Sequence, residues 1–445
     1  MPEQPKRIVI VGGGFAGVTL AQRLERSLPT QTEIFVLSAE NHLVFTPMLP
    51  EVVGRLVSPL HVVVAGRRLT RRAKWLEGRV SRIDRENSEA HYVLRDGTTD
   101  SIRYSQLVLA CGSAANLDEI PGLDSRGYPL KTVIDAIVMG NDLIGNFEAA
   151  VTAPESGARQ RLLTVVVIGG GFSGVEVAGQ IADMMHAMSR FYPELKNETP
   201  RVVLLQKGER LLPELDHESL SEFTLRKLRK NGIDVRLNTS ARNADADAVH
   251  LTSGESIETR LIVCTAGTET HPLIKSLDLP LEKGRLKTHP DMKVSGTTNL
   301  WALGDCSLVP NAFDGRPSPA TAQFAMQQAR QLAKNLKCAS EGTATKPFNF
   351  RPRGMLASIG HHNAVAVIYG VKLSGFVAWF LWRGIYLAKL PTLSRKLEVA
   401  LNWACGIPFP PNIVQLRLSQ KQSPHKERER AETIYKKEVH HEYQA

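Results

Sequence analysis

Two glycine-rich turns of the same design lie 157 positions apart in this chain of 445 residues. Residues 12–17 read Gly-Gly-Gly-Phe-Ala-Gly, and residues 169–174 read Gly-Gly-Gly-Phe-Ser-Gly. Each turn follows a continuous run of β-branched residues, which is typical of a buried parallel strand. Such glycines permit a tight turn and let the backbone approach a pyrophosphate, which the free N–H groups of the next helix bind. Two such turns predict two bound dinucleotides, and we expect such a chain to move electrons between them.

Two acidic residues are candidates for the first site. Ser38 ends the second strand, where an acid commonly binds the adenosine ribose, and Glu40 follows two positions later. Glu40 is either that ribose ligand or an ordinary carboxylate of a surface loop. Asp305 follows a short strand ending in Ala-Leu-Gly, where the ribityl chain and pyrophosphate of a flavin could lie. An aspartate there would also cap a helix, and the two roles are compatible.

The second site carries an amide where a carboxylate is usual. Gln206 ends the strand 201–205, and an NAD-specific site is expected to carry an acid there. A carboxylate binds the ribose hydroxyls and repels a 2′-phosphate, whereas an amide does neither as strongly. Lys207 and Arg210 lie close by in sequence. We expect NADH at this turn with NADPH also accepted; alternatively, Gln206 simply binds the ribose and the two cations are solvated.

Three polar residues on expected helices are candidates for the redox centre. Glu176 lies two residues past Gly174, in the first turn of the expected helix. It either responds only to the helix dipole or orients the nicotinamide ring and relays protons. Gln323 and Gln327 stand four residues apart, so their amides share one helix face. Neutral donors of this kind suit an uncharged carbonyl acceptor such as a quinone; the alternative is a polar face in water.

The elements that must position these residues read as a duplicated α/β fold. Strand 7–11, a helix from about 15 to 27 and strand 33–37 form the first βαβ unit, and its counterpart begins near residue 162. We expect two Rossmann-like dinucleotide-binding domains, one inserted in the other, followed by a C-terminal region of amphipathic helices. The expected bounds are 1–125 with 290–345 for the first domain, 126–289 for the second, 346–416 for the C-terminal region and 417–445 for a charged tail.

The C-terminal region combines aromatic residues with basic charge. Residues 375–390 are apolar but carry two cations, which makes them too short and too charged for a membrane-spanning helix of roughly 20 residues. Residues 351–445 hold 14 Lys and Arg against 6 Glu, most of the formal net charge of +10. This composition predicts helices that lie in the interface of an anionic membrane; the alternative is a core or dimer interface. Nucleic acid is disfavoured because the basic residues lie among apolar runs without a binding motif.

The five cysteines are scattered, with no Cys-x-x-Cys pair. This pattern indicates a reducing compartment, no structural metal and no dithiol active site. The first strand begins within a few residues of the N-terminus, so we expect no signal or transit peptide there.

Together these motifs resemble the type II (alternative, non-pumping) NADH:quinone oxidoreductases, which are flavoproteins. The resemblance runs from Arg7 to about Leu416. The two glycine turns are shared by all two-dinucleotide, disulfide-reductase-like flavoproteins. The more specific motifs are Ala-Gln-x-Ala-x-Gln-Gln at 322–328, Ala-Trp at 378–379 and Asn-Trp at 402–403.

The resemblance implies that the first turn and Asp305 hold FAD and that the second turn holds NAD(P)H. The FAD contacts it implies are Gly12, Gly14, Phe15, Ala16, Gly17, Glu40, Thr46, Gly112, Asp305 and Ala322. The NAD(P)H contacts it implies are Gly169, Gly171, Gly174, Glu176, Gln206 and Gly267. Glu176, Gln323 and Gln327 would act in catalysis, with the two glutamines lining the quinone site. Ser38 and Gln206 depart from the family pattern, which usually has acids there.

The activity implied is hydride transfer from NAD(P)H to FAD, then transfer of two electrons to a membrane quinone without proton pumping. The resemblance also implies a homodimer bound peripherally to the cytoplasmic face of a bacterial inner or plasma membrane. One alternative is a sulfide:quinone oxidoreductase, whose chemistry needs redox cysteines that this sequence does not obviously pair. Another is a flavoprotein sensor or scaffold that binds NAD(P)H but turns over slowly.

Overall fold

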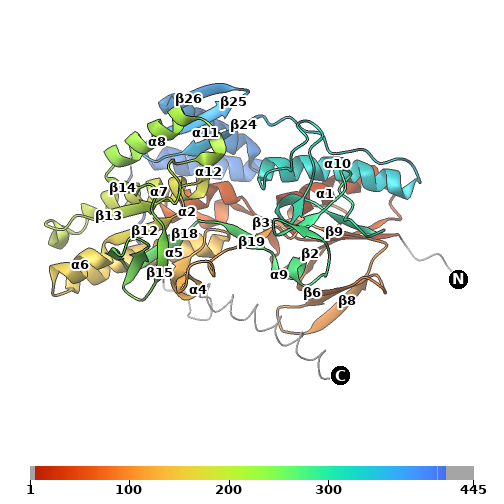
Figure 1. Ribbon diagram of the computed structural model, residues 1–445, viewed down its shortest axis with the longest axis horizontal. Coiled ribbons are helices and arrows are strands. Elements are labelled where there is room, and N and C mark those ends of the chain that lie inside the picture. Colours follow the sequence, from red (N-terminus) through yellow and green to blue (C-terminus); the bar gives the residue numbers. More distant parts are fainter. Residues whose placement is uncertain (1–5, 408, 417–445) are drawn as a thin grey trace. The chain divides into compact units, whose positions relative to one another are not determined.

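The structure is a computed structural model that describes residues 6–407 and 409–416 (Figure 1). The chain forms two compact units, each built from separate stretches of sequence. The first unit comprises the described part of 1–44 together with 63–114 and 268–352. The second comprises 45–62, 115–267 and the described part of 353–445.

The first unit is built on a five-stranded parallel sheet whose strands are buried on both faces. Its first strand is a run of Ile and Val, which favours a strand covered on both sides. Ile10 pairs in register with Val36 on one side and Val108 on the other. In spatial order the strands are β22 (Leu300–Ala302), β9 (Gln106–Leu109), β1 (Arg7–Val11), β2 (Glu33–Ser38) and β5 (Lys74–Glu77).

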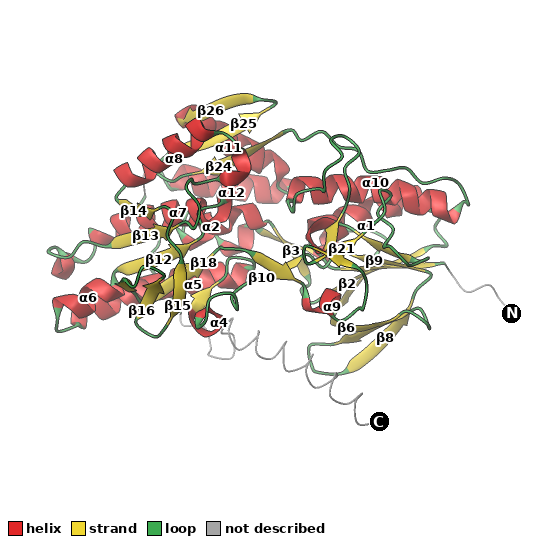
Figure 2. Cartoon of the chain, in the orientation of Figure 1, coloured by secondary structure: helices red, strands yellow, loops and turns green. Residues whose placement is uncertain are grey.

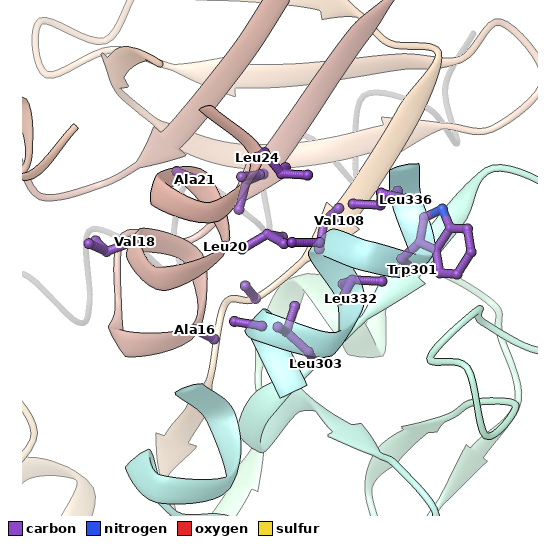
Figure 3. Close-up of a cluster of buried hydrophobic side chains, with 14 of the residues drawn as sticks. Ala16, Val18, Leu20, Ala21, Leu24, Val108, Trp301, Leu303, Leu332 and Leu336 are labelled. Atoms are coloured by element: carbon purple, nitrogen blue, oxygen red, sulfur yellow. The ribbon is translucent and has the colours of Figure 1, made fainter. Parts of the chain in front are cut away.

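Two long helices and a shared hydrophobic core hold this sheet in place. Helix α1 (Phe15–Ser27) packs against helix α10 (Ala322–Ser340). Figure 3 shows Leu20 and Leu24 of α1 beside Leu332 of α10 and Val108 of β9. All four side chains are fully buried. This packing brings the start of α10, from distant sequence, to the helix that follows the first glycine turn.

Smaller elements complete the first unit. They are the antiparallel sheet of β6 (Arg79–Asp84), β7 (Glu89–Val93) and β8 (Thr99–Arg103), the pair β3 (His42–Val44) and β4 (Val63–Ala65), and the sheet of β20 (Leu281–Glu282), β21 (Arg285–Lys287) and β23 (Ser307–Leu308). The short strands β10 (Ser113–Ala115) and β19 (Thr268–Thr270) pair with each other. The short helices are α3 (Gly66–Leu69), α9 (Pro272–Lys275) and the 3-10 turn η5 (Gly304–Cys306).

The second unit repeats the parallel five-stranded plan (Figure 2). Its strands are β11 (Gly127–Tyr128), β18 (Leu261–Cys264), β12 (Thr164–Ile168), β13 (Arg201–Leu205) and β14 (Ile233–Arg236). Its helices are α4 (Leu123–Arg126), α5 (Val133–Thr152), α6 (Ser156–Leu162), α7 (Phe172–Ser189) and α8 (Glu218–Lys230), with the 3-10 turns η3 (Pro193–Leu195) and η4 (Pro213–Leu215). A small antiparallel sheet comprises β15 (Ala241–Ala244), β16 (Ala248–Leu251) and β17 (Ser256–Glu258).

The C-terminal segment also belongs to the second unit. It begins with an antiparallel sheet of β24 (Gly354–Ser358), β25 (Ala364–Ile368) and β26 (Val371–Gly375), and continues into helices α11 (Phe376–Lys389) and α12 (Leu393–Cys405). The same unit takes in the short elements η1 (Thr46–Met48), α2 (Leu49–Val53) and η2 (Pro59–His61).

The expected α/β fold with two Rossmann-like domains is confirmed. The expected domain bounds and the observed units differ in four segments. Residues 115–125, expected in the first domain, lie in the second unit, and residues 346–352, expected in the C-terminal region, lie in the first. Residues 45–62 lie in the second unit because the apolar side chains of α2 are buried against α5 and α7. Residues 268–289 lie in the first unit, where β21 pairs with β23. The expected charged tail of 417–445 lies outside the described residues.

The amphipathic C-terminal helices occur as expected, but the antiparallel sheet before them was not predicted. Within residues 6–407 and 409–416, no helix combines the length and the apolar character needed to cross a membrane.

Candidate functional site

The two glycine turns share one backbone geometry. Gly12 has φ of +116° and Gly169 has φ of +109°, a region that side-chain-bearing residues rarely adopt. A Cβ atom on Gly17 would collide with the carbonyl oxygen of Gly12, and one on Gly174 with that of Gly169. No side chain caps the helix that follows either turn. Each helix therefore presents N–H groups to which a pyrophosphate can bind.

The first unit brings the other expected FAD residues of its own segments to the first turn. Gly304 lies between α1 and α10, because a Cβ atom on it would lie 3.5 Å from Cβ of Ala16 and 3.7 Å from Cβ of Ala325. Its N–H donates to Oε1 of Gln328 at 2.8 Å. Asp305, the next residue, thereby stands half-buried near the starts of both helices. Thr321, not Asp305, caps α10, and the FAD contact of Asp305 stays a prediction.

Three further FAD candidates are placed less closely. Glu40 lies in the loop after β2, with its side chain 61% exposed and one carboxylate oxygen 3.9 Å from Nδ1 of His42. Gly112 follows β9 with φ of +73° and open space where its side chain would be. Thr46 is exposed and belongs to the second unit. The structure thus brings only part of the expected set together within the first unit.

Gln206 is part of the second turn itself. Its Oε1 accepts a hydrogen bond from the Gly170 N–H at 2.9 Å, and its Nε2 donates to the carbonyl of Arg210 at 3.1 Å. The amide therefore fixes the turn and the following loop, a role that the sequence did not indicate. Arg210 forms an ion pair with Asp216 at 3.3 Å, and Gly267, with φ of +72°, follows the neighbouring strand. Gln206 remains positioned to meet a ribose beside the turn.

Glu176 lies deeper than expected. Helix α7 begins at Phe172, so Glu176 lies beyond its first turn, which contains no acid. Its Oε1 accepts hydrogen bonds from the Ser358 N–H at 3.0 Å and from the Trp382 indole at 3.3 Å. Burial raises the pKa of the Glu176 carboxyl to about 8, although both hydrogen bonds oppose this shift. The helix dipole alone therefore does not explain Glu176, because its side chain is buried and hydrogen-bonded to the C-terminal segment.

A second buried carboxyl, Glu51, was missed by the sequence analysis. It lies on α2 with 3% of its surface exposed, and its Oε2 accepts a hydrogen bond from the Trp403 indole at 2.8 Å. Burial raises the pKa of Glu51 to about 7, against the lowering effects of Arg383 and Trp403. The charge of Glu51 in turn raises the pKa of Glu176. The available signal was a lone acid inside the apolar run Pro-Met-Leu-Pro-Glu-Val-Val at 47–53.

An arginine lies between the aromatic side chains of the C-terminal helices. Cζ of Arg383 lies 4.2 Å from the ring centre of Trp379 and 4.6 Å from that of Trp403. Stacked cations of this kind are stabilised by the ring faces. We call the set of Glu51, Glu176, Trp382, Arg383 and Trp403 the buried carboxyl cluster. It holds two acids and one cation, so it can store and release protons near neutral pH.

Gln323 and Gln327 lie in the first turns of α10 in the first unit, and both are half-buried on the same side. Oε1 of Gln327 accepts a hydrogen bond from Arg330 at 3.3 Å. The neighbouring Gln328 is buried and bound to Gly304, so it is a structural residue. The contact of Gln323 and Gln327 with a quinone stays a prediction.

Two cysteines that are distant in sequence meet in the first unit. The Cys306 thiol donates hydrogen bonds to the carbonyl oxygens of Leu109 and Leu303, each at 3.4 Å, and the side chain of Cys111 interacts with it. The interaction with Cys111, with the N–H groups of Gly112 and Cys111, holds the pKa of Cys306 below its usual value. Parallel pairing of β9 with β22 brings the two cysteines together, a pairing that their spacing in sequence does not indicate.

The C-terminal helices each expose an apolar face. On α12, Leu393, Leu397 and Leu401 are exposed at intervals of four residues, while Val399 and Trp403 are buried. On α11, the exposed residues are Phe376, Val377 and Phe380. We call these six exposed residues the apolar face. A contiguous surface of this kind marks an interaction site.

Comparison with known proteins identifies the family. A family model described as pyridine nucleotide-disulphide oxidoreductase matches residues 6–329, and one described as the NDH2 C-terminal domain matches residues 353–407. The chain is 28% identical over 421 residues to the type II NADH:quinone oxidoreductase Ndh of Mycobacterium tuberculosis, covering 90% of this chain and 88% of that one. It is 29% identical to the demethylphylloquinone reductase NdbB of Synechocystis, covering 91% and 96%.

Solved structures agree on the fold. The structure of NDH2 from Plasmodium falciparum in complex with NADH matches with a TM-score of 0.85 at 19% identity, covering 92% of this chain and all of that one. The sulfide:quinone oxidoreductase of Aquifex aeolicus matches with a TM-score of 0.66 at 15% identity, covering 90% and 92%. The chain therefore belongs to the pyridine nucleotide-disulphide oxidoreductase family and, within it, to the type II NADH:quinone oxidoreductases.

Proposed function

We propose that this protein oxidises NADH and reduces a membrane quinone, with FAD as its resident cofactor and without pumping protons. The observation that carries the proposal is the combination of two like dinucleotide turns with C-terminal helices that expose an apolar face. The names of its relatives point the same way, since they include NADH:quinone oxidoreductases and a quinone reductase.

The two turns divide the nucleotides between them. Gly12, Gly14 and Gly17 bind the pyrophosphate of FAD, and Asp305 binds its ribityl region. Gly169, Gly171 and Gly174 bind NADH, with Gln206 at the ribose. When bound, FAD accepts two electrons from NADH and passes them to the quinone, and the protein supplies positioning and electrostatics. NADPH is a weaker substrate in this proposal, because Arg210, one of the two cations near Gln206, already forms an ion pair with Asp216.

The quinone needs protons as well as electrons. NADH, a proton and a quinone give NAD⁺ and a quinol, so each turnover takes up one proton from water. Glu176 supplies that proton from the buried carboxyl cluster, with Glu51 as its partner, because both acids titrate near neutral pH. Gln323 and Gln327 donate hydrogen bonds to the quinone carbonyls.

Half-reactions test this division of roles. Stopped-flow spectra should show rapid flavin reduction by NADH, then reoxidation by a short-chain quinone. In the Gln323→Ala/Gln327→Ala protein, reoxidation should slow by about tenfold or more, the scale of losing buried hydrogen bonds, while reduction by NADH stays unchanged. Equal slowing of both steps would remove the two glutamines from the quinone site. Fast reduction with negligible reoxidation in the wild-type protein would instead favour the sensor or scaffold alternative.

The apolar face provides the membrane contact in this proposal. Leu397 and Leu401 are 58% and 64% exposed, and inserting such side chains into the interface favours binding. We place the protein on the cytoplasmic face of a bacterial membrane as a homodimer, on the resemblance to the family. The Leu397→Glu/Leu401→Glu protein should no longer sediment with anionic liposomes, whereas the exposed control Leu60→Glu should still do so. Retained sedimentation of the double variant would exclude this face.

The thiol pair supports a second candidate function, sulfide-dependent quinone reduction. Cys306 has a lowered pKa and a thiol partner. Oxidation of the two thiols to a disulfide would pass two electrons to FAD, and attack of hydrosulfide on that disulfide would form a persulfide and release one thiol. Sulfide should then reduce the flavin, and Cys306→Ser should abolish that reduction without affecting NADH. Absence of sulfide-driven reduction in the wild-type protein would exclude this function.

A further inference from the structure

Glu176 shares one face of α7 with two other polar residues. Gln180 follows it by four positions and Asp183 by seven, a spacing that aligns side chains along a helix. Gln180 is 5% exposed and Asp183 is half-buried. With a rise of 1.5 Å per residue, Asp183 lies about 10 Å along the axis from Glu176. A polar line thus runs from the buried carboxyl cluster along the helix.

The segment that leaves β24 runs beside this line and binds both of its ends. The Ser358 N–H donates to Oε1 of Glu176 at 3.0 Å, and the His361 N–H donates to Oδ2 of Asp183 at 2.7 Å. Packing between them is close, since a Cβ atom on Gly179 would lie 2.9 Å from the nitrogen of Gly360. The two carboxyls are therefore fixed by one backbone segment.

The middle of the line contains a polar atom that finds no partner. Oε1 of Gln180 is buried and accepts no hydrogen bond from any residue in the described ranges. Leaving such a carbonyl unpaired costs roughly 1–3 kcal/mol, and buried polar atoms of this kind ordinarily bind water. This oxygen faces the end of α2, where a Cβ atom on Gly54 would lie 2.9 Å from it. Gln180 is thus suited to hold water at a level of α7 between those of Glu176 and Asp183, which are too far apart for direct transfer.

The outer end of the line consists of histidines. His361 and His362 are exposed and occupy a turn with φ of +43° and +58°. The ring of His362 lies 4.8 Å from that of Trp379 on α11. Burial raises the pKa of Asp183, while the charges of His361, His362 and His186 lower it. Burial lowers the pKa of His362, and the charges of Arg383 and His361 lower it further, whereas the charge of Asp183 raises it.

We propose that His361, His362, Asp183 and Gln180 form the proton-uptake route to Glu176. A histidine takes a proton from solvent and passes it through water to Asp183, which releases it through water held by Gln180 to the Glu176 carboxylate. Each group returns to its starting protonation state after it has passed the proton on. The net result of the route is therefore the uptake of the one proton that quinone reduction requires. This inference rests on the proposed function, in which Glu176 protonates the reduced quinone.

The test uses the full-length, FAD-loaded protein and the Asp183→Asn variant, with Glu222→Gln on the exposed side of α8 as a matched control. Steady-state quinone reduction by Asp183→Asn should fall about tenfold or more, the scale of a lost proton-transfer group. The fall should grow as the pH rises, because protons in the solvent become scarcer. Flavin reduction by NADH in a stopped-flow instrument should not change. The control should match the wild-type protein in both measurements.

Added imidazole separates proton delivery from structural support. It should restore most of the lost quinone reduction in Asp183→Asn and in His361→Gln/His362→Gln, because a mobile buffer replaces the missing carrier. A slow Asp183→Asn protein that imidazole does not restore would assign Asp183 only to holding the 358–361 turn, and would overturn the proposal. An Asp183→Asn protein as fast as the wild type would overturn it too. If Asp183→Asn fails to fold, the histidine variant provides the same two outcomes.

The Glu176→Gln protein distinguishes a failure of the uptake route from a failure of the proposed function. If Glu176→Gln reduces quinone at the wild-type rate, the role of Glu176 itself is wrong. If Glu176→Gln is slow and imidazole-insensitive while Asp183→Asn is unaffected, Glu176 keeps its role and only the uptake route is excluded.

Discussion

The two glycine turns share a backbone but differ in the side chains around them. Gly12 and Gly169 have nearly the same φ, and Gly17 and Gly174 are required by the same close approach. The position 157 residues before Glu176 is Thr19, a buried neutral residue in α1. One copy therefore has a hydroxyl where the other has a buried acid.

The strand ends differ in the same way. Ser38 ends β2 against the first turn, where its Oγ would lie 2.7 Å from a Cβ atom on Gly13. Gln206 follows β13 and binds the Gly170 N–H. The duplicated backbone explains why two nucleotides bind, and the unequal side chains explain why they have unequal roles. The acid and the ribose-facing amide both belong to the copy proposed to exchange NADH.

The largest effect should come from placing a side chain where the backbone of one turn makes its close contact, one turn at a time. Gly17→Val should abolish FAD incorporation, because its Cβ atom would collide with the Gly12 carbonyl. Gly174→Val should keep FAD but lose NADH binding by about a hundredfold or more, since a backbone clash at the pyrophosphate site cannot relax cheaply. Flavin absorbance and NADH titration measure the two losses.

Gly157→Ala is the control, because a Cβ atom there meets nothing within 4 Å and the residue lies on α6, in neither turn. It should retain FAD. Loss of FAD from the Gly174→Val protein, with FAD retained in Gly17→Val, would reverse the assignment of the two turns.

The second-largest effect concerns Glu176, the acid that only the second copy carries, together with its neighbour Glu51. The pKa values of Glu51 and Glu176 are raised to about 7 and about 8 from 4.5, so the folded state holds protons that the unfolded state releases. Their contribution to stability is complete below about pH 4.5 and is lost as the pH rises towards 8. At about 1.4 kcal/mol per unit, the loss for Glu51 is on the order of 3 kcal/mol.

Denaturant unfolding at a series of pH values checks this expectation. The free energy of unfolding of the wild-type protein should fall between about pH 5 and about pH 8. The Glu51→Gln/Glu176→Gln protein should show a flatter profile, because its amides do not titrate. Parallel profiles for the two proteins would show that neither acid is protonated in the folded state.

The sequence predicts well what depends on local pattern. The glycine turns, the β-branched strands and the amphipathic C-terminal helices each carry a periodic signal, and all of them form as expected. Asp305 was also recoverable, because a short strand ending in Gly-Asp fixes where that carboxylate stands.

Contacts between distant segments could not be predicted. Glu51 reaches Trp403 across 352 positions and Cys306 meets Cys111 across 195, and no local pattern encodes either pair. The antiparallel sheet of β24–β26 was missed for a different reason: its last strand, Val371–Gly375, alternates apolar and polar residues but is only five residues long and largely exposed. What the sequence leaves out is therefore mainly how the C-terminal segment binds α2 and α7.

The smallest effect should come from Gln206, where the two copies differ by one polar group. Gln206→Glu keeps an acceptor for the Gly170 N–H but places a carboxylate oxygen near the Arg210 carbonyl, which now receives the Nε2 hydrogen bond. The new charge repels a 2′-phosphate, whereas the lost hydrogen bond loosens the loop; a net discrimination of about 1 kcal/mol, or about fivefold, is expected. The ratio of kcat/KM for NADH to that for NADPH should rise by that amount. Gln206→Met provides the control, because it removes the hydrogen bonds without adding charge and should weaken both substrates equally. An unchanged ratio in Gln206→Glu would mean that the amide serves only to hold the turn, and that the second copy selects its nucleotide elsewhere.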